Sequence, residues 1–407
     1  MTAAAAGTGS SPPAPLGAFA AVWFTYFATV GLFNPYAPLW FKELGFSTLA
    51  IGAIASMQSW TRVVAPYAWG WLGDRRGRRA EGVRWATGLA LAAAIGLWAS
   101  RAAPGGTAVV LFTAALFLAS GGIVPLTEAA LSQHLQRGGE MDLARYGRVR
   151  VWGSLGFVVA VTLSGVALER SGIGAFPVFA VGAFGVLWLA SWALPSAAEA
   201  SGGGQTGPAV WTVLRRPVVA WFFVGVFLTV MAHTALYAFL SLYLDQLGYG
   251  KGVVGAAWAV AVAAEIAFFW TQGRFFGRLL PLVWLQWAAG LSALRFVLVA
   301  ALGSVLPVLL AAQLLHAMTF AAQHAACITL VHRFFPGALR GRGQALYSVL
   351  GYGCSGVVGG LAGGWLGSHF GFSAVFWAAG GVAVLSWWAL HTAQSHDIGR
   401  DGVKDAL

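Results

Sequence analysis

Four charged side chains and three histidines lie inside long apolar stretches of this sequence. Ionisable groups at such depth in a membrane are costly and usually serve a function. Burial favours the protonated form of a carboxyl group, so an acid that alternates between a basic partner and none would carry a proton. The alternative for each acid is a static ion pair that fixes helix packing. The groups are Arg62, Glu128, Glu265, Arg295, His233, His316 and His324.

Helical spacing places further polar and aromatic side chains on the same faces as these groups. Gln313, His316 and Gln323 share one face, and Trp258 precedes Glu265 by seven residues. A polar stripe on a spanning helix must face protein or water, so we expect a shared cavity. We assign proton coupling to Glu128, Glu265, Arg295 and His316. We assign the substrate cavity to Arg62, Gln58, Arg150, His233, Tyr237, Trp258, Gln313 and Gln323.

The elements that must position these residues are membrane helices. The chain has 407 residues, 58% hydrophobic and 9% charged, whereas a soluble domain carries about 25% charged residues. We therefore predict an all-α membrane protein with twelve transmembrane helices in two six-helix bundles. The predicted crossings are Phe19–Phe41, Leu49–Leu72, Gly82–Ser100, Thr107–Ser132, Tyr146–Leu168, Gly174–Leu194, Val218–Leu244, Val253–Thr271, Leu282–Leu302, Leu306–His332, Gln344–Leu366 and Ser373–Thr392.

An internal repeat supports the division into two halves. The stretch Tyr36–Phe46 aligns with Phe239–Tyr249, and Arg62 then aligns with Glu265. Same-sense repeats of this length are typical of two-bundle transporters. The predicted organisation is a disordered tail (1–16), an N-terminal bundle (17–195), a linker (196–217), a C-terminal bundle (218–393) and a C-terminal tail (394–407).

The formal charge of +11 is placed for a membrane rather than for nucleic acid. Most Lys and Arg residues fall in the termini and in alternate loops, which predicts cytoplasmic termini in a bacterial-type inner membrane. We expect lipid, protons and a small solute as partners, and a monomer. Cys327 and Cys354 lie in apolar runs and indicate no disulfide framework. The sequence has no spaced metal-ligand set, phosphate loop or serine nucleophile elbow, so we expect no metal, cofactor or enzymatic activity.

A basic loop between the second and third crossings carries a recognisable motif. Gly70–Arg79 reads Gly-Trp-Leu-Gly-Asp-Arg-Arg-Gly-Arg-Arg, with five charges in ten residues, which cannot lie in hydrocarbon. It resembles the G-x-L-x-D-R-x-G-R-R signature of the major facilitator superfamily of transporters. That resemblance implies a gating loop, with an acid near a neighbouring helix start in the outward-facing state and arginines bridging the bundle. Its residues here are Gly70, Asp74, Arg75, Gly77 and Arg78.

A closer resemblance spans almost the whole chain. Tyr146–Ser154, Pro125–Glu128, Ala232–Tyr237, Ala264–Glu265 and Leu315–Phe320 are similar to segments of the phenylpropionate-permease branch, which is related to lactose-permease-type proton symporters. This likeness implies that Glu128 and Arg150 form a substrate-contacting pair. It also implies that Glu265, Arg295 and His316 act in coupling. One departure is that the tenth crossing holds no acid, with Phe at position 320.

We therefore expect a secondary active transporter, a proton-coupled symporter that imports a small organic solute such as the aromatic carboxylate 3-phenylpropionate. Either Arg295 or Arg62 would meet the carboxylate. An efflux antiporter of the same fold is one alternative, although Trp152–Leu168 lacks the proline of antiporter signatures. A sugar or nucleoside importer is another. A membrane sensor or scaffold would need no buried acids and bases.

Overall fold

The chain folds as a bundle of long helices. The computed structural model describes residues 16–76, 78–101, 106–137, 140–195 and 210–404. Within those ranges, eleven helices are long and apolar enough to cross a membrane. The remaining predicted crossing is α2 (Thr48–Arg76), which has 29 residues; Gln58 and Arg62 lower its hydropathy. The predicted all-α membrane fold is confirmed.

The first half of the chain contributes seven α-helices to the described ranges. Two short antiparallel strands, β1 and β2, have two residues each and join α5 to α6. In order, the elements are α1 (Leu16–Glu43), α2, α3 (Arg79–Ser100), α4 (Thr107–Ser120), α5 (Ile123–Leu135), β1 (Gln136–Arg137), β2 (Glu140–Met141), α6 (Leu143–Ser171), η1 (Ile173–Ala175) and α7 (Phe176–Ser191).

The second half repeats this arrangement with more interruptions. Three of its crossings contain π-helical turns, η2, η5 and η7. In order, the elements are α8 (Val210–Leu214), α9 (Pro217–Thr234), η2 (Ala235–Phe239), α10 (Leu240–Gln246), α11 (Lys251–Thr271), η3 (Gln272–Arg274), η4 (Phe276–Arg278), α12 (Pro281–Leu302), α13 (Leu306–Leu314), η5 (Ala317–Ala322), α14 (Gln323–Phe334), η6 (Gly337–Leu339), α15 (Arg340–Leu346), η7 (Tyr347–Cys354), α16 (Ser355–Phe370) and α17 (Phe372–Lys404).

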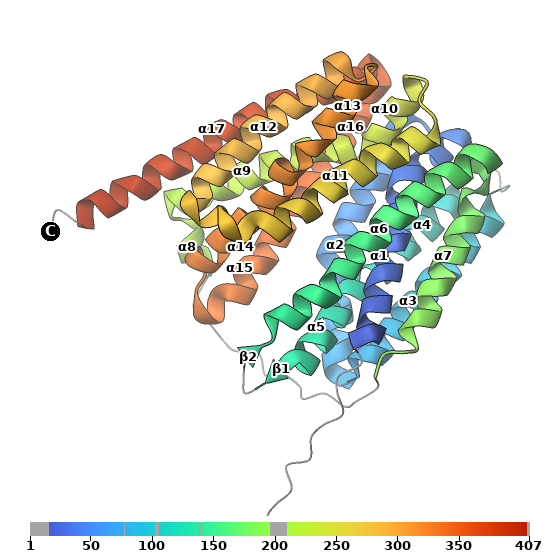
Figure 1. Ribbon diagram of the computed structural model, residues 1–407, viewed down its shortest axis with the longest axis horizontal. Helices are drawn as coiled ribbons and strands as arrows, with labels where there is room; N and C mark the ends of the chain where they lie inside the picture. Colours follow the sequence, from blue (N-terminus) through green and yellow to red (C-terminus); the bar gives the residue numbers. More distant parts are fainter. Residues whose placement is uncertain (1–15, 77, 102–105, 138–139, 196–209, 405–407) are drawn as a thin grey trace, which may run out of the picture.

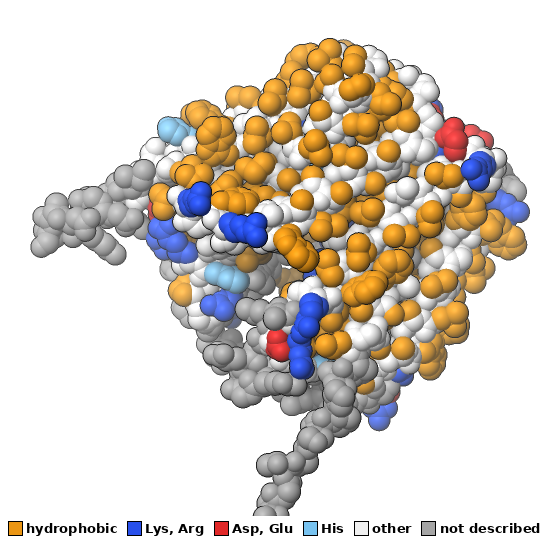
Figure 2. Space-filling view, viewed as in Figure 1, with side chains coloured by type: hydrophobic (Ala, Val, Ile, Leu, Met, Phe, Trp, Pro, Cys, Tyr) orange, Lys and Arg blue, Asp and Glu red, His pale blue; other side chains and the backbone are white. Residues whose placement is uncertain are grey.

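The two halves lie side by side and meet mainly through α2 against α16 and α6 against α11 (Figure 1). Glycines permit the first of these contacts. A Cβ atom added to Gly52 would lie 2.4 Å from the carbonyl oxygen of Gly360 and 2.9 Å from Gly364. Small residues of this kind let helix backbones approach closely in membranes. Hydrophobic side chains cover the broad middle of the visible face, and charged side chains gather toward its ends (Figure 2).

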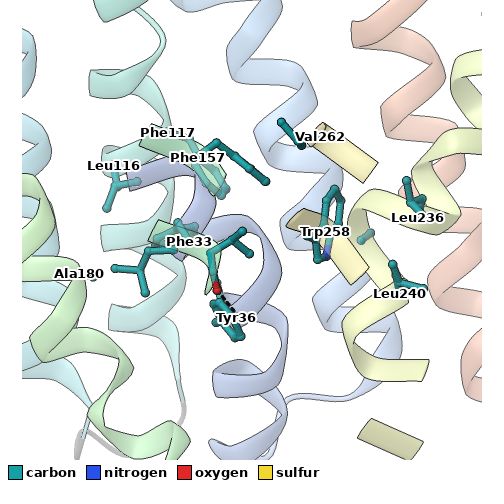
Figure 3. Packing of buried hydrophobic residues seen from close by; sticks show 14 of the residues in the cluster. Phe33, Tyr36, Leu116, Phe117, Phe157, Ala180, Leu236, Leu240, Trp258 and Val262 are labelled. Carbon is teal, nitrogen blue, oxygen red and sulfur yellow. Dashed lines mark hydrogen bonds between the residues drawn. The ribbon is translucent and has the colours of Figure 1, made fainter. Parts of the chain in front are cut away.

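The largest hydrophobic cluster is continuous from one half to the other. Phe33 and Phe157 of the first half and Trp258 of the second belong to it, and the rings of Phe157 and Trp258 lie 6.2 Å apart (Figure 3). Tyr36 is fully buried in the same cluster, and its hydroxyl donates to the carbonyl oxygen of Val161 at 2.7 Å. The interface between the halves is therefore packed over part of its depth.

The predicted division of the chain remains a prediction. Residues 1–15 and much of the predicted linker, 196–209, lie outside the described residues. The described end of the linker forms α8 and the start of α9. The predicted C-terminal tail, 394–407, is helical as far as Lys404, because α17 continues past the last predicted crossing.

Candidate functional site

The π-helical turns of the second half carry much of its polar chemistry. Tyr237 lies in η2, Thr319 in η5, and Tyr347 and Tyr352 in η7. A π turn inserts an extra residue into a helix, which rotates the side chains around it, and such turns are frequent at functional sites. In three crossings of the second half, a π turn therefore moves polar side chains out of the positions that a regular α-helix would give them.

Arg295 on α12 is the centre of the most buried polar cluster. Its side chain is 0% exposed, and its Nη2 donates to Gln313 Oε1 at 2.6 Å. Its Nη1 lies 2.9 Å from His316 Nδ1 and 3.2 Å from Thr319 Oγ1. The guanidinium can only donate, so His316 must accept at Nδ1 and carry its proton on Nε2. Arg295, Gln313 and His316, all predicted from the sequence, are therefore joined with Thr319 in one hydrogen-bonded network.

Glu265 on α11 completes this network. Its Oε2 lies 3.8 Å from His316 Nε2, the atom that carries the proton. The side chain of Glu265 is 18% exposed, while that of His316 is 4% exposed. The acid is therefore the member of the network that water can reach, and His316 stands between it and the charge of Arg295.

Aromatic side chains flank the network. The rings of Tyr237 and Trp258 stack with centroids 6.1 Å apart. His233 Nδ1 donates to the carbonyl oxygen of Thr229 at 2.8 Å. Among the described residues, four buried polar atoms in this region have no hydrogen-bond partner: Arg295 Nε, His233 Nε2, Trp258 Nε1 and Gln323 Nε2. Buried polar groups are normally bonded, so these atoms are available to a ligand or water.

In the first half, Glu128 and Arg150 form a second group. Tyr146 donates to Glu128 Oε1 at 2.9 Å, and Arg150 Nε lies 4.0 Å from the same oxygen. The guanidinium of Arg150 also lies over the rings of Trp23 and Phe27, 4.5 and 4.7 Å from their centres. The sequence-predicted acid–base pair is therefore present, and a phenol and two aromatic rings hold it in place.

A break between α4 and α5 positions Glu128. The crossing is interrupted at Gly121 and Gly122, just before Pro125, and proline removes one further backbone donor. The indole of Trp69 on α2 donates to the carbonyl oxygen of Leu118 at 3.0 Å. The end of α2, which leads into the predicted gating loop, is thereby bonded to the break that precedes Glu128.

Arg62 on α2 is exposed, in contrast to Arg295. Within the described residues it has no ion pair or hydrogen bond. Its neighbours on α2 pack against the second half: a Cβ atom added to Gly356 would lie 2.1 Å from Ser59, and one added to Gly353 would lie 2.2 Å from Val63. Arg62 therefore lies on a helix that packs against the second half, and its own side chain is exposed.

One turn before Arg62, Gln58 Nε2 donates to Asn34 Oδ1 at 3.2 Å. The same helix, α2, lies against η7 and η2 of the second half, which carry Tyr352 and Tyr237. The polar residues of the two halves thus lie on elements that pack against each other.

The predicted gating loop is described only in part. Gly70 lies in α2, and Arg78 forms an ion pair with Glu81 at 2.9 Å at the start of α3. Gly77 and the side chains of Asp74 and Arg75 lie outside the described residues. The loop's proposed bridging role therefore stays a prediction.

A cavity of about 460 Å³ lies elsewhere, between α2, α3 and α4. None of the predicted site residues lines it. Its walls are apolar, and several are exposed, such as Val64, Leu89 and Leu118, as expected where helices face lipid acyl chains.

Sequence reasoning missed several neutral members of the site. Thr319 bonds Arg295, Tyr146 bonds Glu128, and Asn34 bonds Gln58. Thr319 follows His316 by three residues and gave the only available signal, a polar residue at helical spacing. Tyr146 begins the Tyr146–Ser154 segment that carries the family resemblance, but no role followed for it, and nothing in the sequence distinguished Asn34.

Long helices in two repeated halves, with facing polar groups between them, define a two-bundle membrane transporter. The chain belongs to the MFS_1-like family of the major facilitator superfamily, whose family model matches residues 16–378.

Among curated relatives, the chain is 29% identical to the "Probable 3-phenylpropionic acid transporter" of Escherichia coli, over 89% of this chain and 93% of that protein. It is also 29% identical to the "Maltose permease" of Geobacillus stearothermophilus, over 70% of each. The nucleoside transporter NupG has a similar fold, with a TM-score of 0.75 at 17% identity, covering 93% of this chain and 98% of that one.

Proposed function

We propose that this protein is a proton-coupled symporter that imports a small aromatic carboxylate of the 3-phenylpropionate type across the bacterial inner membrane. The observation that carries the proposal is the placement of Glu265 beside His316 Nε2, at 3.8 Å, with Arg295 bound to the other ring nitrogen. This arrangement supports an acid whose charge is balanced in one state and released in another.

Glu265 is a better proton carrier than Glu128. Glu128 accepts a hydrogen bond from Tyr146 and has Arg150 beside it, and both contacts favour its ionised form. Glu265 has only the His316 contact at 3.8 Å, and its side chain is 18% exposed, against 30% for Glu128. Its greater burial favours the protonated form. Protonation of Glu265 would remove a negative charge from the space into which an anionic substrate must move.

Arg62 is the better anchor for the substrate carboxylate. Arg295 is fully buried and already binds Gln313, His316 and Thr319. Arg62 is exposed, and a planar guanidinium suits bidentate binding of a carboxylate. The stacked rings of Tyr237 and Trp258 offer an aromatic surface for the rest of the substrate. A maltose-like sugar would leave the charge of Arg62 unmatched.

The test is uptake of labelled 3-phenylpropionate into proteoliposomes. We expect a pH gradient, acidic outside, to drive accumulation by the native protein. Glu265→Gln should abolish gradient-driven accumulation yet retain exchange of labelled for unlabelled substrate. Glu128→Gln, the matched carboxyl control, should retain a response to the gradient. If Glu265→Gln responds to the gradient like the native protein, Glu265 is not the coupling residue.

A further inference from the structure

A set of contacts joins the two halves at the end of the molecule opposite to the last residues of α17. No residue of the proposed binding site takes part in these contacts. Lys42 Nζ at the end of α1 lies 2.8 Å from Asp245 Oδ2 at the end of α10. Glu169 on α6 reaches the start of α11, where it accepts from the backbone N–H groups of Lys251 and of Gly252. We call these three side chains, Lys42, Asp245 and Glu169, the distal contact.

Lys42 and Asp245 occupy equivalent positions in the internal repeat, 203 residues apart. The turns that follow them have the same geometry. Gly45 has a φ of 85° and Gly248 a φ of 84°. The backbone hydrogen bond from Gly45 to Lys42 matches the bond from Gly248 to Asp245, and both are 3.0 Å long. Equivalent residues of two repeats can touch only near the axis that relates the halves, so this ion pair lies on that axis.

The helix start at Lys251 makes Glu169 a good partner. The first backbone N–H groups of a helix have no acceptor within the helix, and the helix dipole favours an anion there. Gly250 leaves room for the carboxylate, because a Cβ atom at this position would lie 2.6 Å from both of its oxygens. The carboxylate is supplied by the opposite half, so this helix cap exists only while the two halves are together at this end.

We infer that the distal contact is a gate: it holds this end closed in the conformation seen here and must break when the site opens to that side. The packing between the halves next to the distal contact supports this inference. Ser56 of α2 is 4% exposed and donates to the carbonyl oxygen of Val357 in α16 at 3.0 Å. Tyr36 lies between α6 and α11, with its hydroxyl 3.4 Å from the carbonyl oxygen of Lys251. The inference rests on one part of the proposed function, namely that the protein is a transporter whose site opens at this end.

The test measures opening without any substrate. A Ser56→Cys reporter, in a Cys327→Ala and Cys354→Ala background, is labelled in nanodiscs with a water-soluble maleimide. We expect Lys42→Asp and Asp245→Lys each to speed labelling about two- to five-fold, the range for a partly exposed ion pair. The charge-swapped double variant should return to the parental rate, because the two positions are geometrically equivalent.

The helix cap has its own variants. Gly250→Ala leaves Glu169 intact and suits the φ of −71° at this position, but its methyl group displaces the carboxylate. Gly250→Ala and Glu169→Gln should each speed labelling, the first by about ten-fold or more, as expected for lost bonds to a charged acceptor.

Arg333→Ala is the matched control. It removes a two-bond ion pair with Asp397 inside one half, and it should leave labelling unchanged. Parental labelling rates in both single charge variants would overturn the inference, as would a double variant that labels as fast as the singles. Uptake need not be measured, so failure of the gate and failure of the proposed substrate give different results.

Discussion

Replacing Arg62 by glutamine should separate anionic from neutral substrates. Arg62 is exposed and has no ion pair within the described residues, and its helix, α2, packs against the second half. A hydrogen bond to a charged partner contributes about 1.5–3 kcal/mol. Since 1.4 kcal/mol corresponds to a tenfold change, Arg62→Gln should weaken binding of 3-phenylpropionate by about ten- to a hundredfold. Arg62→Lys keeps the charge but loses the planar fork, so it should lie between the two.

The assay is displacement of labelled 3-phenylpropionate in counterflow, with the free acid and its neutral primary amide as competitors. The amide lacks the charge, so its competition in Arg62→Gln should change by less than about threefold. Arg148→Gln, which removes an exposed arginine from α6, serves as the control and should behave like the native protein. Equal losses for acid and amide would refute the reasoning, because they would show that Arg62 shapes the site rather than binding the carboxylate.

Three changes test the supporting structure through the melting temperature in detergent. Arg295→Met should destabilise the protein and abolish transport, because it leaves the buried acceptors on Gln313 and His316 without a donor, and each such group costs about 1–3 kcal/mol. Gly156→Ala should lower the melting temperature, since its Cβ atom would lie 2.1 Å from the Phe24 carbonyl oxygen, whereas Gly182→Ala meets nothing within 4 Å and should be neutral. Trp69→Phe should cost about 0.5–1.5 kcal/mol through the lost bond at the α4 break.

The fold could be predicted from the sequence because a bilayer sets the length and composition of each crossing. Even α2, whose hydropathy is lowered by Gln58 and Arg62, lies where the pattern placed it. The π-helical turns that interrupt the crossings could not be predicted from length and composition. The apolar run from Leu306 to His332 gives no sign that η5 inserts a π turn at Ala317–Ala322, because that turn depends on tertiary packing.

Residues of the candidate site could be picked out in the sequence where their charge stands out in an apolar helix. Arg295, His316 and Glu265 lie on three crossings, and the structure joins them into one network. The sequence could not rank Arg295 against Arg62 as the carboxylate anchor, since both are arginines in apolar helices. Burial and bonding distinguish them, and both depend on contacts between helices that no single helical pattern contains.

The internal repeat suggests why the two halves carry opposite charges at equivalent positions. Lys42 aligns with Asp245, and Arg62 aligns with Glu265 by the same offset. Opposite charges at equivalent positions attract strongly only where both residues lie close to the axis that relates the halves. At the distal end the pair is in contact at 2.8 Å. Deeper in the molecule, Arg62 and Glu265 form no ion pair with each other in the described structure, and Glu265 lies near His316 instead. In this proposal, the same symmetry gives a closing contact where Lys42 meets Asp245. Where Arg62 and Glu265 stay apart, it leaves one position for a carboxylate and one for a proton.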